Sequence, residues 1–122
     1  MTSYEQVAER YLAIWNEADD ARRRALMDET WSAAARYADP MMTGEGRDGI
    51  AAMIAAARGQ FPGLRFSLDG RLDGHGPHLR FSWRLAPEGG PVVARGTDFA
   101  ALDDQGRIET VVGFLDQMPA AA

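Results

Sequence analysis

The sequence contains no cysteine, so it can form neither a disulfide nor a thiolate metal site. No stretch approaches the roughly 20 apolar residues that span a bilayer, so we expect no membrane partner. Positive charge is also in deficit. The formal net charge is −5, which argues against a nucleic-acid partner, because such binding depends on neutralising phosphates. The first residues lack a basic segment followed by an apolar run, so we expect no signal peptide and a cytoplasmic location.

The composition is that of an ordinary globular protein. The chain has 122 residues, of which 46% are hydrophobic and 25% are charged. A chain of this length can bury a core of its own, and it shows no repeat or linker. We therefore expect residues 1–122 to form a single domain.

Helical periodicity dominates the first half of the chain. Apolar residues recur at helical spacing over residues 3–17, and a second helix is predicted from about 22 to 31. A third helix is predicted over residues 49–58, where alanines are frequent and Asp48 can cap the first turn. A short extended segment near residues 37–39 separates the second helix from the third.

The hydrophobic period changes to two in the second half, which is typical of strands. Alternation and glycine-rich turns predict strands over residues 64–72, 79–85, 92–102 and 108–115. Helices followed by an antiparallel meander indicate an α+β domain, with the helices on one face of the sheet.

Asp39 is the most informative polar residue in the chain. It precedes Pro40, which disfavours a helical backbone at Asp39, and on an extended backbone Tyr37 and Asp39 share a face. If this face lines a cavity, Asp39 is a carboxylate in apolar surroundings. Alternatively, Asp39 caps backbone N–H groups in a turn.

Two other groups of residues have less specific patterns. His75 and His78 lie in a glycine-rich loop with no third ligand near them in the sequence, so we expect no metal site there. Met41 and Met42 are either flexible pocket lining or residues of the core or rim, and the second interpretation is favoured.

Four short motifs resemble the nuclear transport factor 2-like superfamily, which includes SnoaL-like proteins, ketosteroid isomerases and limonene epoxide hydrolases. The motifs are Arg10–Leu12, Tyr37–Pro40, Gly46–Ile50 and Asp104–Ile108, and their order and spacing carry the resemblance. It implies a cystatin-like cone, in which three N-terminal helices pack in a curved antiparallel β-sheet. It also implies a homodimer formed through the outer face of the sheet. The fold alone does not define the function.

Three residues match the ketosteroid isomerases of this superfamily. The resemblance implies that Asp39 is the general base and that Tyr11 and Asp98 are donors to the substrate oxyanion, without a cofactor. An additional pocket tyrosine of these isomerases falls near Ala57, so this hydrogen-bond network would be smaller here. Asp98 could instead be ionised and paired with an arginine, for which Arg84 and Arg95 are available.

The limonene epoxide hydrolases match less well. The arginine of their Asp–Arg–Asp relay falls at Gly96, and the second aspartate falls near Gly113. The nearest acid to this second position is Asp116, whose odd offset predicts the opposite face of the sheet unless a bulge resets the register.

The leading hypothesis is a small isomerase- or polyketide-cyclase-like protein that binds a small hydrophobic molecule in a buried pocket. A non-catalytic ligand-binding domain and a dimerisation domain with a filled pocket remain alternatives. The expected pocket residues are Tyr11, Trp15, Tyr37, Asp39, Met53, Trp83, Asp98 and Phe114.

Overall fold

The computed structural model describes residues 3–117, which form three helices and six strands. The helices are α1 (Tyr4–Asn16), α2 (Asp20–Thr30) and α3 (Gly46–Gln60). The strands are β1 (Trp31–Ala38), β2 (Thr43–Glu45), β3 (Leu64–His75), β4 (His78–Pro87), β5 (Ala94–Leu102) and β6 (Ile108–Gln117).

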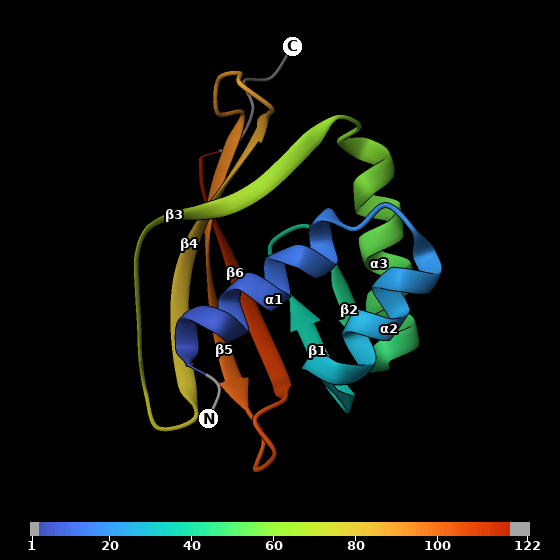
Figure 1. Cartoon of the computed structure of the whole chain (residues 1–122), viewed down its shortest axis with the longest axis vertical. Helices are drawn as coiled ribbons and strands as arrows, with labels where there is room; N and C mark the ends of the chain where they lie inside the picture. Colours follow the sequence, from blue (N-terminus) through green and yellow to red (C-terminus); the bar gives the residue numbers. More distant parts are fainter. Residues whose placement is uncertain (1–2, 118–122) are drawn as a thin grey trace.

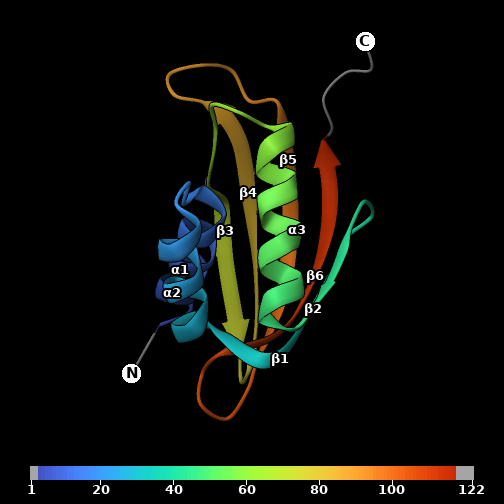
Figure 2. The same cartoon turned by 90° about the vertical axis from the view of Figure 1, so that its right-hand side faces the viewer.

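The strands form one sheet in the order β2-β1-β6-β5-β4-β3. All neighbours pair antiparallel except β1 and β6, which pair parallel. Figures 1 and 2 show the curved sheet with the three helices on one of its faces. The predicted α+β class and cystatin-like cone are confirmed by this arrangement.

The first helix begins where the sequence predicts a cap. Ser3 Oγ accepts the Gln6 backbone N–H at 3.1 Å, and Gln6 Oε1 accepts the Ser3 N–H at 3.0 Å, which is a capping box. The apolar stripe of α1, which includes Tyr11 and Trp15, is buried against the sheet. This helix therefore brings two aromatic side chains with polar atoms into the interior.

The region around β1 differs from the sequence prediction. Strand β1 begins at Trp31, where we expected the end of a helix, and residues 43–45 form β2, a strand that the sequence analysis did not predict. Helix α3 begins at Gly46 rather than Gly49, and Asp48 forms an ion pair with Arg24 instead of capping the helix. We had expected only a short extended segment near residues 37–39. The observed strand is longer and pairs with both β2 and β6, so the backbone N–H and C=O groups of β1 find hydrogen-bond partners on both sides.

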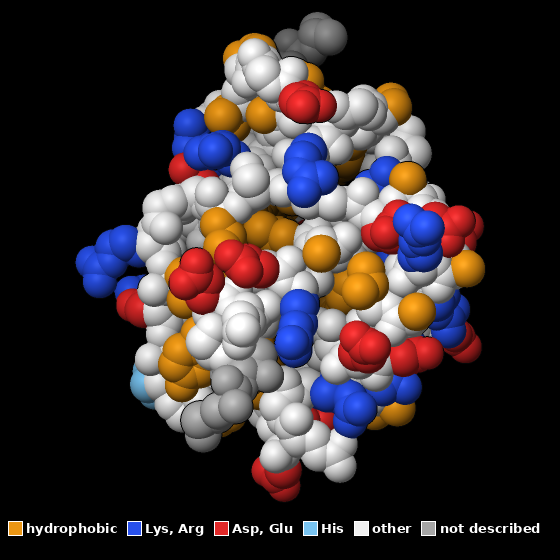
Figure 3. Space-filling view, in the orientation of Figure 1, with side chains coloured by type: hydrophobic (Ala, Val, Ile, Leu, Met, Phe, Trp, Pro, Cys, Tyr) orange, Lys and Arg blue, Asp and Glu red, His pale blue; other side chains and the backbone are white. Residues whose placement is uncertain are grey.

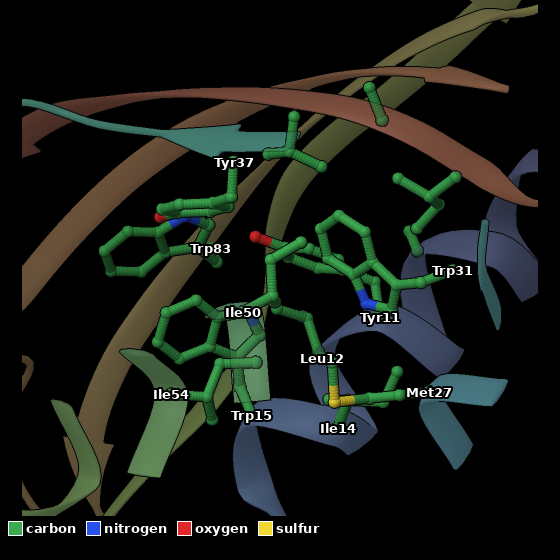
Figure 4. Close-up of a cluster of buried hydrophobic side chains, with 14 of the residues drawn as sticks. Tyr11, Leu12, Ile14, Trp15, Met27, Trp31, Tyr37, Ile50, Ile54 and Trp83 are labelled. Atoms are coloured by element: carbon green, nitrogen blue, oxygen red, sulfur yellow. The ribbon is translucent and has the colours of Figure 1, made fainter. Parts of the chain in front are cut away.

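The core lies between the helices and the concave face of the sheet. Trp31, Tyr11, Phe81 and Ile54 are among its largest fully buried side chains. Aromatic rings pack edge to face within it; for example, the ring centroids of Tyr11 and Phe81 are 5.3 Å apart. Figure 4 shows this cluster, with Tyr11 and Trp15 from α1 close to Tyr37 and Trp83 from the sheet.

Candidate active site

A cavity lies between the helices and the sheet, and its walls are mostly apolar. Its volume is about 60 Å³, counted as the space open to the centres of water-sized spheres. Figure 3 shows hydrophobic side chains in a hollow near the centre of this face of the molecule, with charged side chains around it. The lining residues with polar side-chain atoms are Tyr11, Trp15, Tyr37, Asp39, Trp83 and Asp98.

Asp98 is the charged side chain on the inner face of β5. Strand alternation places it inward with Gly96 and Ala100, and only 3% of its surface is exposed. The Tyr11 hydroxyl donates a hydrogen bond of 2.7 Å to Asp98 Oδ2. Burial raises the pKa of Asp98 to about 6, although the Tyr11 hydroxyl and the Trp83 indole oppose this rise.

The alternative that Asp98 pairs with an arginine does not occur in the structure. Arg95 forms its ion pair with Asp69, and Arg84 Nη1 lies 3.8 Å from Asp69 Oδ1. Asp69 lies at an irregularity of β3, between Leu68 and Leu72, where the register with β4 shifts. Since both arginines face Asp69, Asp98 keeps a tyrosine as its hydrogen-bond partner.

Asp39 follows β1 and is half-buried at the cavity. Its Oδ1 accepts the backbone N–H groups of Met41 and Met42 at 2.7 and 2.9 Å. Its Oδ2 accepts the Tyr37 hydroxyl at 2.6 Å. The two alternatives that the sequence left open therefore occur together, because Asp39 caps a turn and also lines the cavity.

Gly113 on β6 allows the two carboxyl groups to approach each other. It pairs with Asp98, and a Cβ atom at this position would lie 2.8 Å from Asp98 Oδ1 and 3.1 Å from Asp39 Cβ. Any larger residue would displace at least one of these groups. The nearby Asp39 contributes to the raised pKa of Asp98, after the larger effect of burial.

Both tyrosines of the site remain protonated at neutral pH. Burial raises the pKa of Tyr11 well above 10, and the charge of Asp98 adds to this effect. The pKa of Tyr37 is raised in the same direction by burial and by Asp98. Each hydroxyl can therefore act as a hydrogen-bond donor, and in this structure each donates to a carboxylate.

Six of the eight expected pocket residues line the cavity, and the other two do not. Met53 on α3 is buried in the core instead of the cavity wall. Phe114 is 56% exposed on the outer face of β6, because its neighbour Gly113 points inward. These two placements correct the sequence expectation.

The cavity also has lining residues that the sequence analysis did not assign to it. Phe66 and Leu85 could have been found from the alternation of β3 and β4. Met41 and Met42 line the cavity, which was the less favoured alternative, but Met41 is 62% exposed and Met42 also packs against the core. The remaining ones come from elements whose packing the sequence does not define; these are Leu12, Ala57, Phe61, Ala94 and Leu115.

The relay of the epoxide hydrolases has no counterpart at the matching positions. A Cβ atom on Gly96 would lie 2.2 Å from Trp83 Cζ2, so an arginine cannot replace it without moving the indole. Asp116 is exposed and accepts a hydrogen bond of 2.7 Å from Thr97 on the outer face of the sheet. The register of β6 shifts beside Asp116, not at Gly113, so it does not return this carboxylate to the cavity.

Two features are absent from the part of the chain that the structure describes, namely a cluster of metal-ligating side chains and a membrane-spanning helix. Within residues 3–117, no group of three or more His, Cys, Asp or Glu side chains could hold a metal ion. The rings of His75 and His78 lie 5.7 Å apart. None of the helices in this part of the chain is both long and apolar enough to cross a membrane.

Comparison with known proteins places the chain in a family. The model of the SnoaL-like domain matches residues 8–111, whereas no curated protein matches the chain. The structure of a candidate isomerase of the SnoaL-like family from Agrobacterium tumefaciens is 56% identical, with a TM-score of 0.90, and the match covers 95% of this chain and 99% of that chain.

More distant structures share the fold. A candidate SnoaL-like polyketide cyclase from Jannaschia sp. CCS1 is 21% identical, with a TM-score of 0.70, over 95% of this chain and 90% of that one. A protein with a ketosteroid isomerase-like fold from Catenulispora acidiphila, in complex with trimethylamine, is 14% identical, with a TM-score of 0.72, over 91% and 85%. From the family match and the 56% identical structure, this chain belongs to the SnoaL-like family of the nuclear transport factor 2-like superfamily.

Proposed function

We propose that the chain binds a small, largely apolar molecule with a carbonyl or ring oxygen and catalyses proton transfer on it without a cofactor. The observation that carries this proposal is the pair of carboxyl groups, Asp39 and Asp98, which share one apolar cavity in different environments. Asp98 is buried with a raised pKa, whereas Asp39 is half-buried and held by three donors. When two carboxyl groups have different environments, one can be protonated and act as an acid at a pH at which the other is ionised and acts as a base.

In this proposal, Asp39 accepts a proton from the carbon beside the ligand's carbonyl group. Its hydrogen bonds to Tyr37, Met41 and Met42 fix the orientation of the carboxylate, and one lone pair of Oδ2 stays available. When the ligand is bound, the Tyr11 hydroxyl turns its hydrogen from Asp98 Oδ2 to the ligand oxygen, where negative charge develops, and the protonated Asp98 carboxyl donates a second hydrogen bond there. The proton returns from Asp39 to another carbon of the same molecule, which completes an isomerisation.

The cavity volume limits the size of the ligand. The cavity is partly open to solvent, and its volume of about 60 Å³ is below the roughly 150 Å³ of an enclosed apolar cavity that holds benzene, so a ring would enter it only in part. This space suits a compound with a single ring better than one with four fused rings. We therefore propose a single-ring ketone or a molecule of similar size as the ligand class.

The proposal can be tested with cyclohex-3-en-1-one, whose isomerisation to the conjugated cyclohex-2-en-1-one is followed by ultraviolet absorbance. We expect the wild-type chain to accelerate this reaction and Asp39→Asn to lower the rate by about 100-fold or more, because it removes the base. Asp104→Asn is the matched control, since it neutralises an exposed carboxylate that does not line the cavity. Equal rates for Asp39→Asn and the wild type would overturn the assignment of the base.

A non-catalytic ligand-binding domain is the second candidate function. It is favoured by the three hydrogen bonds that Asp39 accepts, two of which come from backbone N–H groups of a turn. In this case the cavity binds cyclohexenone, and neither the wild type nor Asp39→Asn changes the isomerisation rate. Binding without turnover, measured by calorimetry alongside the rate, separates the two functions.

We also propose that two copies of the chain form a homodimer through the outer face of the sheet. Phe99, Val112 and Phe114 are exposed there by 40%, 38% and 56%, on the neighbouring strands β5 and β6. Adjacent exposed apolar side chains of this kind are typical of interaction surfaces. Pairing of two copies would remove these side chains from water while leaving the cavity, on the opposite face, accessible.

A further inference from the structure

Four aromatic side chains form a continuous aromatic wall of the cavity; they are Tyr37 from β1, Trp15 from α1, Phe66 from β3 and Trp83 from β4. In this order, the ring centroids of successive neighbours lie 5.7, 5.5 and 5.1 Å apart. The planes of successive rings are inclined to each other by 53°, 61° and 77°. At such steep angles the rings turn their faces in different directions, so they surround a space instead of forming a flat stack.

The Trp83 indole lies on the inner face of the sheet, over Gly96. A Cβ atom at Gly96 would lie 2.2 Å from Trp83 Cζ2 and 2.6 Å from Trp83 Cε2, so the indole occupies the space of the missing side chain. Figure 4 shows Trp83, Tyr37 and Trp15 on the same side of the buried cluster. The aromatic wall therefore contains two indoles, and indole is the aromatic group that attracts a cation most strongly.

The cavity carries acidic groups and no basic one. Asp39 and Asp98 line it, and within the described part of the chain none of the lining residues is a lysine, arginine or histidine. Arg84 and Arg95 both face Asp69 instead. A negative charge in a cavity with apolar walls is poorly screened by solvent, so an opposite charge beside it is strongly attracted. A cation that enters from outside would supply this opposite charge.

The oxygen atoms of the two carboxyl groups already have hydrogen-bond donors. The Tyr11 hydroxyl donates to Asp98 Oδ2 at 2.7 Å, and the Trp83 indole is a second donor to Asp98. Asp39 accepts three hydrogen bonds, which leaves little capacity for more. A primary ammonium group brings three N–H donors that need acceptors, whereas a quaternary ammonium group brings none. Of these two kinds of cation, the quaternary ammonium group therefore fits the cavity better.

We propose that the cavity binds the quaternary ammonium head of a small organic cation, which lies between the rings of the aromatic wall and close to Asp98. The cavity volume of about 60 Å³ is small, so the head alone is enclosed. The rest of the molecule extends toward Met41, which lines the cavity and is 62% exposed. This inference goes beyond the proposed proton transfer, because it adds a second class of ligand and needs no chemical step.

Choline and 3,3-dimethylbutan-1-ol test this proposal. The two molecules have nearly the same shape, and the charged nitrogen of choline is replaced by a neutral carbon in the alcohol. Binding is measured by calorimetry at about pH 8, which is above the pKa of about 6 of Asp98, so that this carboxyl group is ionised. We expect the wild type to bind choline more tightly than the alcohol by roughly 10-fold or more, from the aromatic faces and the carboxylate together.

Two variants with matched controls separate these contributions. Asp98→Asn keeps the shape of the side chain and removes its charge, so it should lower the preference for choline by roughly 5-fold or more. Its control is Asp104→Asn, which neutralises an exposed carboxylate away from the cavity. Phe66→Leu removes one ring of the aromatic wall and should lower the preference by roughly 2- to 5-fold. Its control is Phe99→Leu, which removes an exposed ring outside the cavity lining.

The pH dependence of choline binding is a second measurement, and it needs only the wild type. Since the pKa of Asp98 is about 6, this residue is mostly protonated and neutral at about pH 5, and choline should bind up to about 10-fold more weakly there than at about pH 8. The binding of the neutral alcohol should not weaken. The other titratable groups that act on Asp98 are Tyr11 from α1, Tyr37 and Asp39 from β1 and the turn after it, and Asp116 from β6.

The outcomes distinguish this inference from the proposed function. Equal affinities of the wild type for choline and the alcohol would overturn the inference. Equal losses in Asp98→Asn and Asp104→Asn would also overturn it, because they would reflect the net charge of −5 instead of the cavity. If choline fails to bind while cyclohex-3-en-1-one is isomerised, the proposed function stands alone. If choline binds with the expected preference and no isomerisation occurs, the inference stands and the proton transfer fails.

Discussion

At the scale of single residues, Asp98 shows how burial changes an ordinary carboxyl group. Its partner is the neutral hydroxyl of Tyr11, and no arginine compensates its charge, because Asp69 engages both Arg84 and Arg95. Removal from water therefore dominates, and it raises the pKa of Asp98 from 3.8 to about 6. Between about pH 4 and pH 6, the folded chain therefore holds a proton at Asp98 that the unfolded chain has already released.

This difference predicts a pH dependence of stability. Between about pH 4 and pH 6 the folded state binds more protons at Asp98 than the unfolded state, so this residue's contribution to the free energy of unfolding falls as pH rises. A pKa difference of about two units corresponds to about 3 kcal/mol, lost in full above about pH 6. Asp98→Asn cannot ionise and keeps an acceptor for Tyr11, so it should lack this loss.

Urea unfolding of the wild type and Asp98→Asn at several pH values between about 4 and 7 measures the effect. Other carboxyl groups affect both proteins alike, so the difference between the two curves isolates Asp98. We expect the stability of Asp98→Asn relative to the wild type to increase toward neutral pH. Parallel curves would mean that Asp98 is not desolvated in the folded state.

The candidate site could be predicted in part from single residues. Asp39 before Pro40 and the resemblance of Tyr11 and Asp98 to the isomerase pattern indicated residues that do line one cavity. The partner of Asp98 could not be predicted, because it depends on Asp69. That residue lies at an irregularity of β3, which a simple alternation of side chains does not anticipate.

At the scale of elements, Phe114 faces outward instead of lining the cavity as the sequence analysis expected, and this has a clear cause. The run from Val111 to Leu115 contains no polar side chain, so its sequence does not show which residues face inward. The pairing of Gly113 with Asp98 decides this, and it places Phe114 on the opposite face. By contrast, the strands with clear polar alternation, such as β4, were predicted with their inner residues in place.

Gly96 is required by the packing of β4 against β5. A methyl group at this position would lie 2.2 Å from Trp83 Cζ2 and 2.8 Å from the Phe114 carbonyl oxygen. We expect Gly96→Ala to destabilise the chain by about 1–3 kcal/mol, as overpacking does, and to displace the Trp83 indole from the cavity wall. Thermal or urea unfolding and Trp fluorescence measure these two effects.

The control for this substitution lies on α3. A methyl group added at Gly59, an exposed helical residue, would meet nothing within 4 Å beyond its own stretch of helix. Gly59→Ala should therefore stabilise the chain by about 0.5–1 kcal/mol, because alanine favours the helix. A loss of stability for Gly59→Ala as large as that for Gly96→Ala would contradict the packing explanation.

At the scale of the whole molecule, the two faces of the sheet have different compositions. The concave face is covered by the helices and contains the cavity, whereas the outer face carries exposed Phe99, Val112 and Phe114. The order of helices and strands was enough to predict this layered fold. The parallel pairing of β1 with β6 was not predicted, because it joins segments about 75 residues apart and has no local signal.

The proposed homodimer leads to a prediction for Phe114→Arg. A charged side chain at the centre of the apolar outer face would be costly to bury, so this variant should be monomeric where the wild type is dimeric. Met41→Arg is the control, since Met41 is 62% exposed but lies at the cavity rather than on the outer face. Sedimentation or light scattering gives the mass; equal masses for the wild type and Phe114→Arg would contradict the proposed interface.

The central claim is that the cavity raises the pKa of the Asp98 carboxyl group from 3.8 to about 6. The most direct test is an NMR titration of the Asp98 carboxyl carbon in the wild-type chain. The structure predicts a midpoint at about 6. A midpoint at or below about 4, the usual value for aspartate, would contradict it, because Asp98 would then be solvated or ion-paired and unsuited to donate to a ligand oxygen.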